Sequence, residues 1–530
     1  MNPLAIHNPG PMPHPRMKNH PRIYGIIHFS LNTFTNLEWG YGDESPTLFN
    51  PTCFDADQIA AGCRAGGLEG LVIVCKHHDG FCLWPTRTTA HNVTNSPFSR
   101  DLVGELTAAL RRAGLKVGFY VSPWDRNDPS YGTPDYLEIY RAQLREVLTN
   151  YGEAFEVWFD GANGGDGYYG GAREVRKIDH ATYYDWTNTW ALVRQLQPNA
   201  AIFSDIGPDL RWVGNELGCA LPESSARYTP ESPDGKPVAP GNVRWQLGTS
   251  GHADGDFWLP PECDFPLRPG WFYHASEDNR LRSVHQLIDI YCRSIGAGGY
   301  FNIGIAPDRR GRLHENDVKR LAEFKTAVDS LFARPQPLAD TEFNLIRLRE
   351  DGDEKVRGYR VLADGKDVAA GNLIGIERLI RLPRTVKAAR VELAADAPAT
   401  LELFLAPPDL LTAPAEGETI RASHQYRVLS ARNAGNGVFT GEFPASEHEF
   451  STFVWTPRAN PPHPARCGLE LSFDGVHFAA PVEAEFGNIC ANPIPQLIRF
   501  APGKPRQWRL TVLRTVGGDG DPMPLELGVL

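Results

Sequence analysis

Short apolar runs alternate with amphipathic stretches from residue 23 to residue 331 of this chain. The apolar runs are typical of buried strands, which we expect at 23–29, 70–75, 116–121, 155–159, 201–204, 244–247 and 300–305. The amphipathic stretches have the period of a helix, and we expect helices at 57–65, 102–113, 135–150, 183–197, 281–295 and 317–331. Such alternation predicts a parallel sheet with crossover helices. We therefore predict an α/β fold, a (β/α)8-like TIM barrel, since no GxGxxG follows the first strand as a dinucleotide-binding fold requires.

The pattern changes after the segment RPQP at 334–337. Helical periodicity gives way to short alternating runs that are typical of strands, and a second break falls at Pro407-Pro408. The first twenty residues are rich in Pro, His and Asn, which favours a loose arm. We expect four regions: a flexible N-terminal arm at 1–21, the barrel at 22–335, a β-sandwich domain at 336–408 and a second β-sandwich at 409–530.

Charge and cysteine content limit which binding partners and which cellular compartment we expect for this chain. A net charge of −11 argues against nucleic acid or an anionic membrane as a partner. The nine cysteines include no CxxC pair, so we expect a fold that does not depend on disulfides. The N-terminus lacks the apolar core of a secretory signal, and no stretch is long enough for a membrane span. The chain as given is expected to be cytoplasmic, or periplasmic or secreted if a signal was trimmed.

Asp160 ends an apolar aromatic run, Glu156-Val157-Trp158-Phe159, and is followed by Gly161. A carboxylate at the end of a buried strand is costly to desolvate unless something uses it. In a parallel barrel the carboxyl ends of the strands carry the chemistry. Asp160 is therefore a candidate nucleophile or base, and the alternative is an Asp that only caps the next helix.

Polar and aromatic side chains also follow other predicted strands, and their loops would converge on one face of a barrel. These loops contain His28, Glu38, Trp39, His77, His78, Tyr120 and Glu216. His77 and His78 are adjacent and are expected to point in opposite directions, which disfavours a shared metal ion. Without an HExxH or another Cys/His ligand cluster, we expect hydrogen bonding to hydroxyl groups, with satisfied core histidines as the alternative.

Two carboxylates suffice for glycoside hydrolysis, one to attack and one to protonate the leaving oxygen. Asp160 could attack, and Glu216, near Trp212 in sequence, could be the acid if partial burial keeps it protonated. Glu38 is a third carboxylate, and the sequence does not rank it against Glu216, which could also be a surface acid. A serine nucleophile is disfavoured because the chain has no GxSxG elbow.

The chain resembles the α-L-fucosidase family of retaining glycoside hydrolases over most of residues 22–330. The resemblance rests on KHHDGFCLWPT at 76–86, VWFDGA at 157–162, RPGWFYH at 268–274 and FNIGIAPDRRGRL at 301–313. RWVGNE at 211–216 and the segment at 356–382 resemble the subgroup that acts on α-1,3/4-linked fucose. SFDGVHF at 472–478 and WRLTVLRT at 508–515 resemble a discoidin-like carbohydrate-binding module. The first strand departs from the family, with GIIHFSLNTFTN where His-Trp-Gly is usual.

The resemblance implies a role for each candidate residue. Asp160 would be the nucleophile and Glu216 the general acid/base. The substrate-binding residues it implies are His28, Glu38, Trp39, His77, His78, Tyr120 and Trp271, with Trp271 near the fucose methyl or the leaving-group sugar. No cofactor and no metal ion would be needed.

The activity implied is exo-acting, retaining hydrolysis of terminal α-1,3/1,4-linked L-fucose from branched oligosaccharides or glycoconjugates. One alternative is a retaining exo-glycosidase that prefers a sugar of the galactose type. Another is a glycan-binding protein without catalysis, although such a protein needs neither an attacking carboxylate nor an acid. A purely structural protein would not explain the clustered histidines and aromatic residues.

Overall fold

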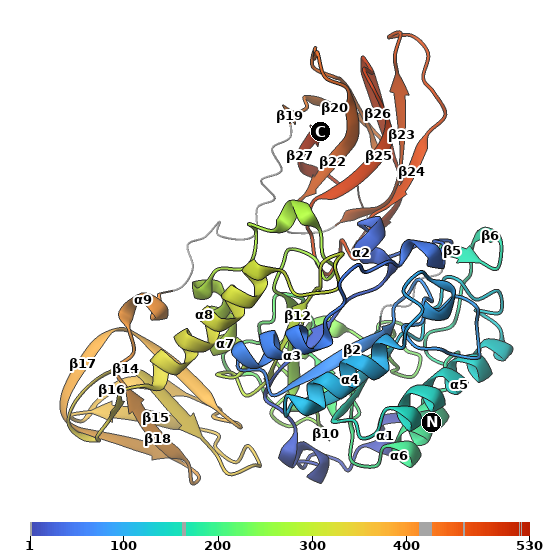
Figure 1. Ribbon diagram of the computed structural model, residues 1–530. Helices are drawn as coiled ribbons and strands as arrows, with labels where there is room; N and C mark the ends of the chain where they lie inside the picture. The colour runs from blue at the N-terminus through green and yellow to red at the C-terminus, as the bar shows by residue number, and fades with distance from the viewer. Residues whose placement is uncertain (1–2, 162–165, 413–426, 459–461, 519, 521) are drawn as a thin grey trace. The chain divides into compact units, whose positions relative to one another are not determined.

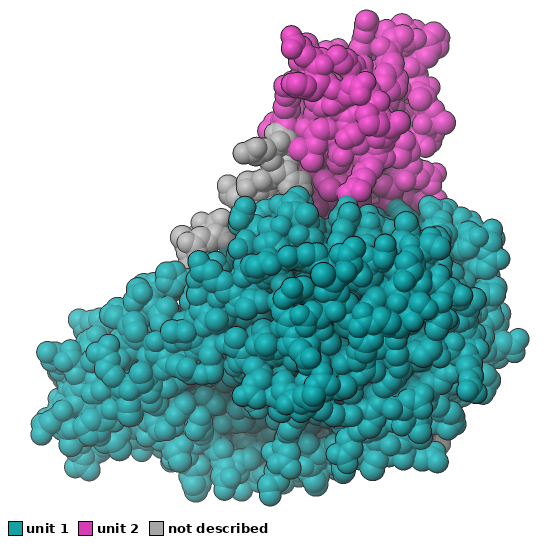
Figure 2. Space-filling view, in the orientation of Figure 1, with its two compact units in different colours: residues 1–414 teal, residues 415–530 magenta. Residues whose placement is uncertain are grey.

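The computed structural model describes residues 3–161, 166–412, 427–458, 462–518, 520 and 522–530. These residues form two compact units, residues 1–414 and 415–530, drawn in teal and magenta in Figure 2. The larger unit holds a barrel, a six-stranded antiparallel sheet and two two-stranded sheets, and the smaller unit holds two further sheets. The boundaries expected between the three folded regions stay a prediction.

Eight parallel strands close into a barrel in the order β1-β12-β11-β8-β7-β4-β3-β2; β2 and β12 are labelled in Figure 1. Their bounds are β1 Ile23–Ile27, β2 Gly70–Lys76, β3 Lys116–Val121, β4 Glu156–Trp158, β7 Ala201–Ser204, β8 Leu210–Trp212, β11 Pro261–Pro266 and β12 Tyr300–Ile305. The predicted barrel is confirmed.

Six α-helices each follow a barrel strand: α3 Ala56–Ala65, α4 Leu102–Arg112, α5 Pro134–Asn150, α6 Trp186–Leu196, α7 Val284–Ser294 and α8 Glu315–Phe332. The connections after β7 and β8, which are described throughout, contain no α-helix. The second of them carries β9 Arg227–Tyr228, the 3-10 helix η4 Trp245–Thr249 and β10 Phe257–Trp258. The ring of helices is therefore incomplete on that side of the barrel.

The strand expected at 244–247 is wrong, because these residues lie at the start of η4. Two barrel strands were not predicted from the sequence: β8, which has three residues, and β11, which reads PECDFP. β11 places Glu262 and Asp264 where barrel strands normally carry apolar side chains, and both are buried. An apolar-run criterion does not detect a strand with two buried acids and a proline at each end.

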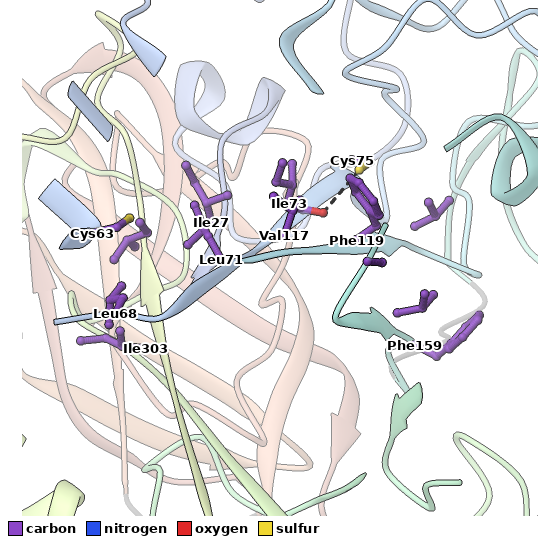
Figure 3. Packing of buried hydrophobic residues seen from close by; sticks show 14 of the residues in the cluster. Ile27, Cys63, Leu68, Leu71, Ile73, Cys75, Val117, Phe119, Phe159 and Ile303 are labelled. Carbon is purple, nitrogen blue, oxygen red and sulfur yellow. Dashed lines mark hydrogen bonds between the residues drawn. The ribbon is translucent and has the colours of Figure 1, made fainter. Parts of the chain in front are cut away.

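Alternate residues of the barrel strands serve two separate cores. Ile73 of β2 packs in the layer beneath the helices, whereas Val72 and Val74 belong to the cluster inside the barrel. Figure 3 shows part of the outer layer, where Phe159 packs beyond the end of β4. Because side chains alternate along an extended chain, Asp160 faces the barrel axis.

Residues 3–20 pack against the barrel, which differs from the loose arm expected there. They include the helices α1 Pro3–His7 and η1 Pro15–Asn19. Leu4 is fully buried, and the Asn8 amide donates to the backbone oxygens of Pro208 and Trp258. Met17 joins the cluster inside the barrel. Apolar anchors spaced through this Pro-rich segment hold it against the barrel, so local composition does not predict the packing.

One six-stranded antiparallel sheet follows the barrel, in the order β13-β18-β14-β17-β15-β16 (Figure 1). Its strands are β13 Pro335–Gln336, β14 Ala339–Arg349, β15 Tyr359–Ala363, β16 Lys366–Gly371, β17 Arg378–Ala395 and β18 Thr400–Phe404. Ile346, Val361, Val391 and Leu403 contribute to its apolar core. The short alternating runs at 378–382 and 388–393 lie on one long strand, β17, which pairs with both β14 and β15.

The smaller unit contains two antiparallel sheets, β19-β27-β22-β25 and β20-β21-β26-β23-β24. The bounds are β19 Arg427–Val428, β20 Ala431–Gly435, β21 Val438–Glu442, β22 Phe450–Pro457, β23 His463–Ser472, β24 Val482–Glu485, β25 Gln496–Gly503, β26 Gln507–Val516 and β27 Pro524–Val529. Phe453 and Ile498 of one sheet and Leu469 and Trp508 of the other share one apolar cluster, as in a β-sandwich.

The remaining elements are short: α2 Leu31–Thr35, η2 Pro46–Leu48, η3 Val93–Asn95, β5 Asp166–Tyr169, β6 Ala172–Val175, η5 Ala275–Glu277 and α9 Pro408–Leu411. Within the described part of the chain, no helix combines the length and the apolar character needed to cross a membrane.

Candidate active site

Asp160 lies at the carboxyl end of β4, and its carboxylate is engaged by two neighbours. The Tyr120 hydroxyl, from the end of β3, donates to Asp160 Oδ2 over 3.0 Å. His78 Nε2 lies 3.6 Å from the same oxygen, and the Asp160 side chain remains 22% exposed. Asp160 does not cap the next described helix, α6, because that helix begins at Trp186 with Asp185 at its N-cap. The accessible carboxylate therefore fits a chemical role better than a capping role.

His28, His77 and His78 form one cluster at this end of the barrel. The rings of His77 and His78 lie 4.1 Å apart, and those of His28 and His77 lie 5.6 Å apart. The expectation that His77 and His78 point in opposite directions is wrong, because β2 ends at Lys76 and the pair sits in the loop that follows. Within the described residues, no three His, Cys, Asp or Glu side chains are grouped to hold a metal ion.

All three imidazoles are held in the neutral form by burial. Burial lowers the pKa of His28 to about 3. The pKa values of His77 and His78 are also well below the usual value, through burial first; the next cause is the neighbouring His78 for His77 and Arg126 for His78. A neutral imidazole offers one donor and one acceptor, so the cluster is suited to binding hydroxyl groups.

The Glu38 carboxylate anchors the loop at 270–274. It accepts hydrogen bonds from the backbone N–H of Trp271 at 2.8 Å and of Phe272 at 3.3 Å, and contacts His274 Nε2 at 2.9 Å. Burial lowers the pKa of His274, but Glu277 and Glu38 outweigh it and the net pKa is raised. Glu38 thus holds other parts of the protein with both carboxylate oxygens.

Trp39, which follows Glu38, lines the cluster from another direction. Its ring lies edge-on to His78 at 5.5 Å and to Trp124 at 5.5 Å. The loops after β1, β2 and β3 therefore meet around His78, as their places at the carboxyl ends of adjacent strands predict.

Trp271 connects the histidine cluster to Glu216. Its ring lies 5.1 Å from His28, and its indole Nε1–H donates to Glu216 Oε2 over 2.8 Å. Glu216 follows β8, and it is partly buried. Contacts thus run from Asp160 through the three histidines and Trp271 to Glu216, and the structure brings all nine sequence-predicted residues to the same end of the barrel.

Two acids near Asp160, the partly buried Asp205 and the buried Asp264, were not singled out from the sequence. Asp205 follows β7 directly, accepts a hydrogen bond from Gly241 N at 2.9 Å, and has its pKa raised to about 7 by burial and by the charge of Asp160. The signal was the one that identified Asp160, a carboxylate right after a buried strand. Asp264 lies on β11, which the apolar pattern does not predict, and accepts from Trp212 Nε1 at 2.6 Å.

Ser122 is a further residue that the sequence did not single out. It is fully buried, and its hydroxyl lies 2.8 Å from His78 Nδ1. The only sequence signal was its place directly after the predicted strand at 116–121, which any polar loop residue shares.

A family model and a plant relative that match this chain both carry the description alpha-L-fucosidase. A family model described as Alpha-L-fucosidase matches residues 15–326. Alpha-L-fucosidase 1 of Arabidopsis thaliana is 39% identical over 348 residues, 64% of this chain and 64% of the plant protein. The chain therefore matches slightly less than two thirds of the length of that relative.

Two crystal structures resemble this protein over nearly its whole length. A glycoside hydrolase 29 family member from an unknown rumen bacterium is 35% identical with a TM-score of 0.68, and the match covers 99% of this chain and 100% of that one. A Bacteroides ovatus protein is 32% identical with a TM-score of 0.66, over 98% and 95% of the two chains. With a family model that spans more than half of its residues, this chain belongs to the α-L-fucosidase family.

Proposed function

We propose that this protein is an exo-acting, retaining α-L-fucosidase that removes terminal α-1,3/1,4-linked L-fucose from branched oligosaccharides or glycoconjugates. The observation that carries the proposal is the chain of contacts between Asp160 and Glu216 at the carboxyl end of the barrel. Family membership supports the activity, and the segment RWVGNE at 211–216 supports the linkage.

Asp160 is assigned the role of nucleophile. Its Oδ atom attacks the anomeric carbon while Glu216 gives its proton to the glycosidic oxygen, so that the leaving sugar departs and a fucosyl–enzyme ester forms. Glu216, now a carboxylate, takes a proton from water, and the water oxygen displaces Asp160 from the anomeric carbon. Two inversions give net retention, and retaining enzymes hold their two carboxyl groups about 5–5.5 Å apart.

The neighbouring side chains fit supporting roles. The Tyr120 hydroxyl donates to Asp160 and so holds the attacking carboxylate in place. His28, His77 and His78 are neutral and are assigned to the sugar hydroxyls, and Trp39 to the sugar face. Glu38 is assigned to the loop that carries Trp271, in addition to the sugar contact expected from the sequence. The second β-sandwich, expected at 409–530, is proposed as a discoidin-like carbohydrate-binding module.

Product analysis tests the proposal. The full-length protein is incubated with linear α-1,2- and branched α-1,3/4-fucosylated trisaccharides, and with aryl α-L-fucoside and aryl galactosides. We expect fucose release from the branched substrates, with the α anomer seen first by proton NMR. First appearance of the β anomer would overturn the retaining mechanism, and release from linear substrates alone would overturn the linkage. Hydrolysis of galactosides only, or binding without hydrolysis, would replace the proposal by one of its alternatives.

A Glu216→Ala variant tests the acid. Protonation of the leaving oxygen matters most for a poor leaving group, so hydrolysis of the trisaccharide should fall by about 10²–10⁴-fold. The first step on an aryl fucoside with an acidic phenol should be much less affected. Equal losses on both substrates would remove Glu216 from the role of acid.

A further inference from the structure

We propose that Ser122 is a positioning residue that fixes the tautomer of His78. In this arrangement His78 carries its proton on Nδ1 and presents Nε2 as a hydrogen-bond acceptor toward Asp160. Any ligand hydroxyl bound at Nε2 must then donate its proton. In this tautomer His78 donates no hydrogen bond to the Asp160 carboxylate.

Hydrogen-bond accounting around Ser122 leads to this tautomer. The Ser122 Oγ–H donates to the backbone oxygen of Trp124 over 2.8 Å. A hydroxyl has one proton, so the contact of 2.8 Å between Ser122 Oγ and His78 Nδ1 requires that Nδ1 be the donor. In a neutral imidazole the other nitrogen, Nε2, then has a lone pair and no proton.

The backbone fixes both partners in this contact. Ser122 N donates to Lys76 O over 3.0 Å, and Arg126 N donates to His78 O over 2.8 Å. Ser122 is fully buried, and the His78 ring also contacts Trp124 at 4.9 Å. The hydroxyl and the imidazole therefore meet at a junction of the loops after β2 and β3 that has little freedom to rearrange.

Without Ser122, the charge of Asp160 would favour the opposite tautomer. His78 Nε2 lies 3.6 Å from Asp160 Oδ2, which is too long for a hydrogen bond but close enough for one to form after a small shift. A proton on Nε2 would be stabilised by the carboxylate and would make it a poorer nucleophile. The Ser122 contact opposes this preference, which gives the serine a role beyond filling space.

The other charged and titratable groups near His78 do not favour protonation of its Nε2. Arg126, Lys76 and His28 lower its pKa together with burial, so His78 stays neutral. His28 and His77 offer a contrast within the same cluster, since their Nδ1 atoms are buried without a hydrogen-bond partner in the structure. Neither has a counterpart of Ser122 at Nδ1.

Nitrogen NMR reads the tautomer directly. The full-length protein is labelled with ¹⁵N-histidine, and long-range ¹H–¹⁵N correlation spectra are recorded from pH 5.5 to pH 8. The His78 signals are assigned by their loss in His78→Gln. We expect the wild type to carry the proton on Nδ1 throughout, and Ser122→Ala to shift it to Nε2.

Ser294→Ala is the matched control. Ser294 is also fully buried and donates to a backbone oxygen, that of Ile290 at 2.7 Å, but it lies on α7 and touches no histidine of the cluster. This variant should leave the His78 spectrum unchanged. Ser122→Thr, which keeps the hydroxyl, should restore the Nδ1–H tautomer where it folds. A wild-type proton on Nε2, or an unchanged His78 tautomer in Ser122→Ala, would overturn the proposal.

Measurement of kcat/KM provides a second test of the role of Ser122, and this test rests on the proposed fucosidase function. Ser122→Ala should lower kcat/KM for aryl fucoside by about 10- to 100-fold, whereas Ser294→Ala should not. Wild-type protein without fucosidase activity, together with the expected tautomer shift, would refute the proposed function and leave the tautomer assignment standing. Full activity in a Ser122→Ala protein whose tautomer has shifted would overturn the claim that the tautomer serves catalysis.

Discussion

The indole Nε1–H of Trp271 donates a hydrogen bond of 2.8 Å to Oε2 of Glu216. The family resemblance implies that Trp271 lies near the fucose methyl or the leaving-group sugar, and that contact stays a prediction. The structure adds a second function for the same side chain, because a residue held by the Glu38-anchored loop now orients the candidate acid. Through its backbone N–H and its indole, Trp271 thus links the loops after β1, β8 and β11.

Replacement of Trp271 by Phe removes the indole donor and keeps an aromatic ring. A hydrogen bond to a charged group contributes about 1.5–3 kcal/mol, so we expect kcat/KM on a branched trisaccharide to fall by about 10- to 100-fold. Trp84→Phe is the control, because Trp84 Nε1 donates to Glu146 Oε2 over the same 2.8 Å outside the site. Equal activity of the two variants would show that Trp271 does not orient the acid.

Replacement of Asp160 by Gly should abolish turnover and leave the fold intact. The carboxylate is 22% exposed and lies outside the apolar clusters, so its loss should change Tm by only a few degrees. Azide added to the variant should restore cleavage of an activated aryl fucoside and yield a fucosyl azide of inverted configuration, since the small anion can fill the space of the missing nucleophile. Unchanged hydrolysis without azide would remove Asp160 from the mechanism.

Removal of the Glu38 carboxylate should destabilise the protein as well as weaken activity. Glu38→Ala leaves two backbone N–H groups and His274 without their acceptor, so we expect a loss of about 3 kcal/mol in the free energy of unfolding, measured by chemical denaturation. Glu138→Ala, at a side chain 81% exposed, is the control. A raised KM with unchanged stability would instead support a role in sugar binding alone.

A methyl group at Gly304 should act through Trp271. A Cβ at this position of β12 would lie 2.6 Å from the Trp271 ring, so Gly304→Ala must displace the indole from Glu216. Overpacking of this kind costs about 1–3 kcal/mol, and we expect kcat/KM to fall as far as in Trp271→Phe. Gly358→Ala is the control, because its nearest contact would be 3.8 Å away. Activity near wild type in Gly304→Ala would mean that the indole can move without cost.

The sequence predicts those strands of this protein whose residues are apolar because both of their faces are buried. The strands at 116–121, 201–204 and 300–305 match β3, β7 and β12 residue for residue, because their apolar runs are buried on both faces. The apolar pattern does not predict β11, because its acids Glu262 and Asp264 are stabilised by partners on other strands. These partners are Trp158 Nε1 and Trp212 Nε1. The contacts of Glu38 and Ser122 are likewise set by backbone groups distant in sequence, which no local pattern reveals.

A pH-dependent stability is expected from the acids at the other end of the barrel interior. Glu156 is fully buried on β4, and burial raises its pKa to about 8. Burial and Glu156 raise the pKa of Glu262 well above its usual value. His20, 3.6 Å from Glu156, has its pKa lowered to about 4 by burial. The folded protein therefore holds Glu156 protonated over a range in which the unfolded chain, with an ordinary Glu pKa near 4.5, has lost that proton.

Unfolding thus releases a proton from Glu156 between about pH 4.5 and pH 8, and the free energy of unfolding should fall as the pH rises through this range. Glu262 acts in the same direction, whereas His20 lowers stability only as the pH falls from about 6.5 toward 4. Glu156→Gln keeps the shape and removes the titration, so its Tm relative to wild type should increase steadily from pH 5 to pH 8. Glu138→Gln at the surface should show no such trend. Parallel Tm curves for wild type and Glu156→Gln would show that this carboxyl group does not remain protonated in the folded barrel.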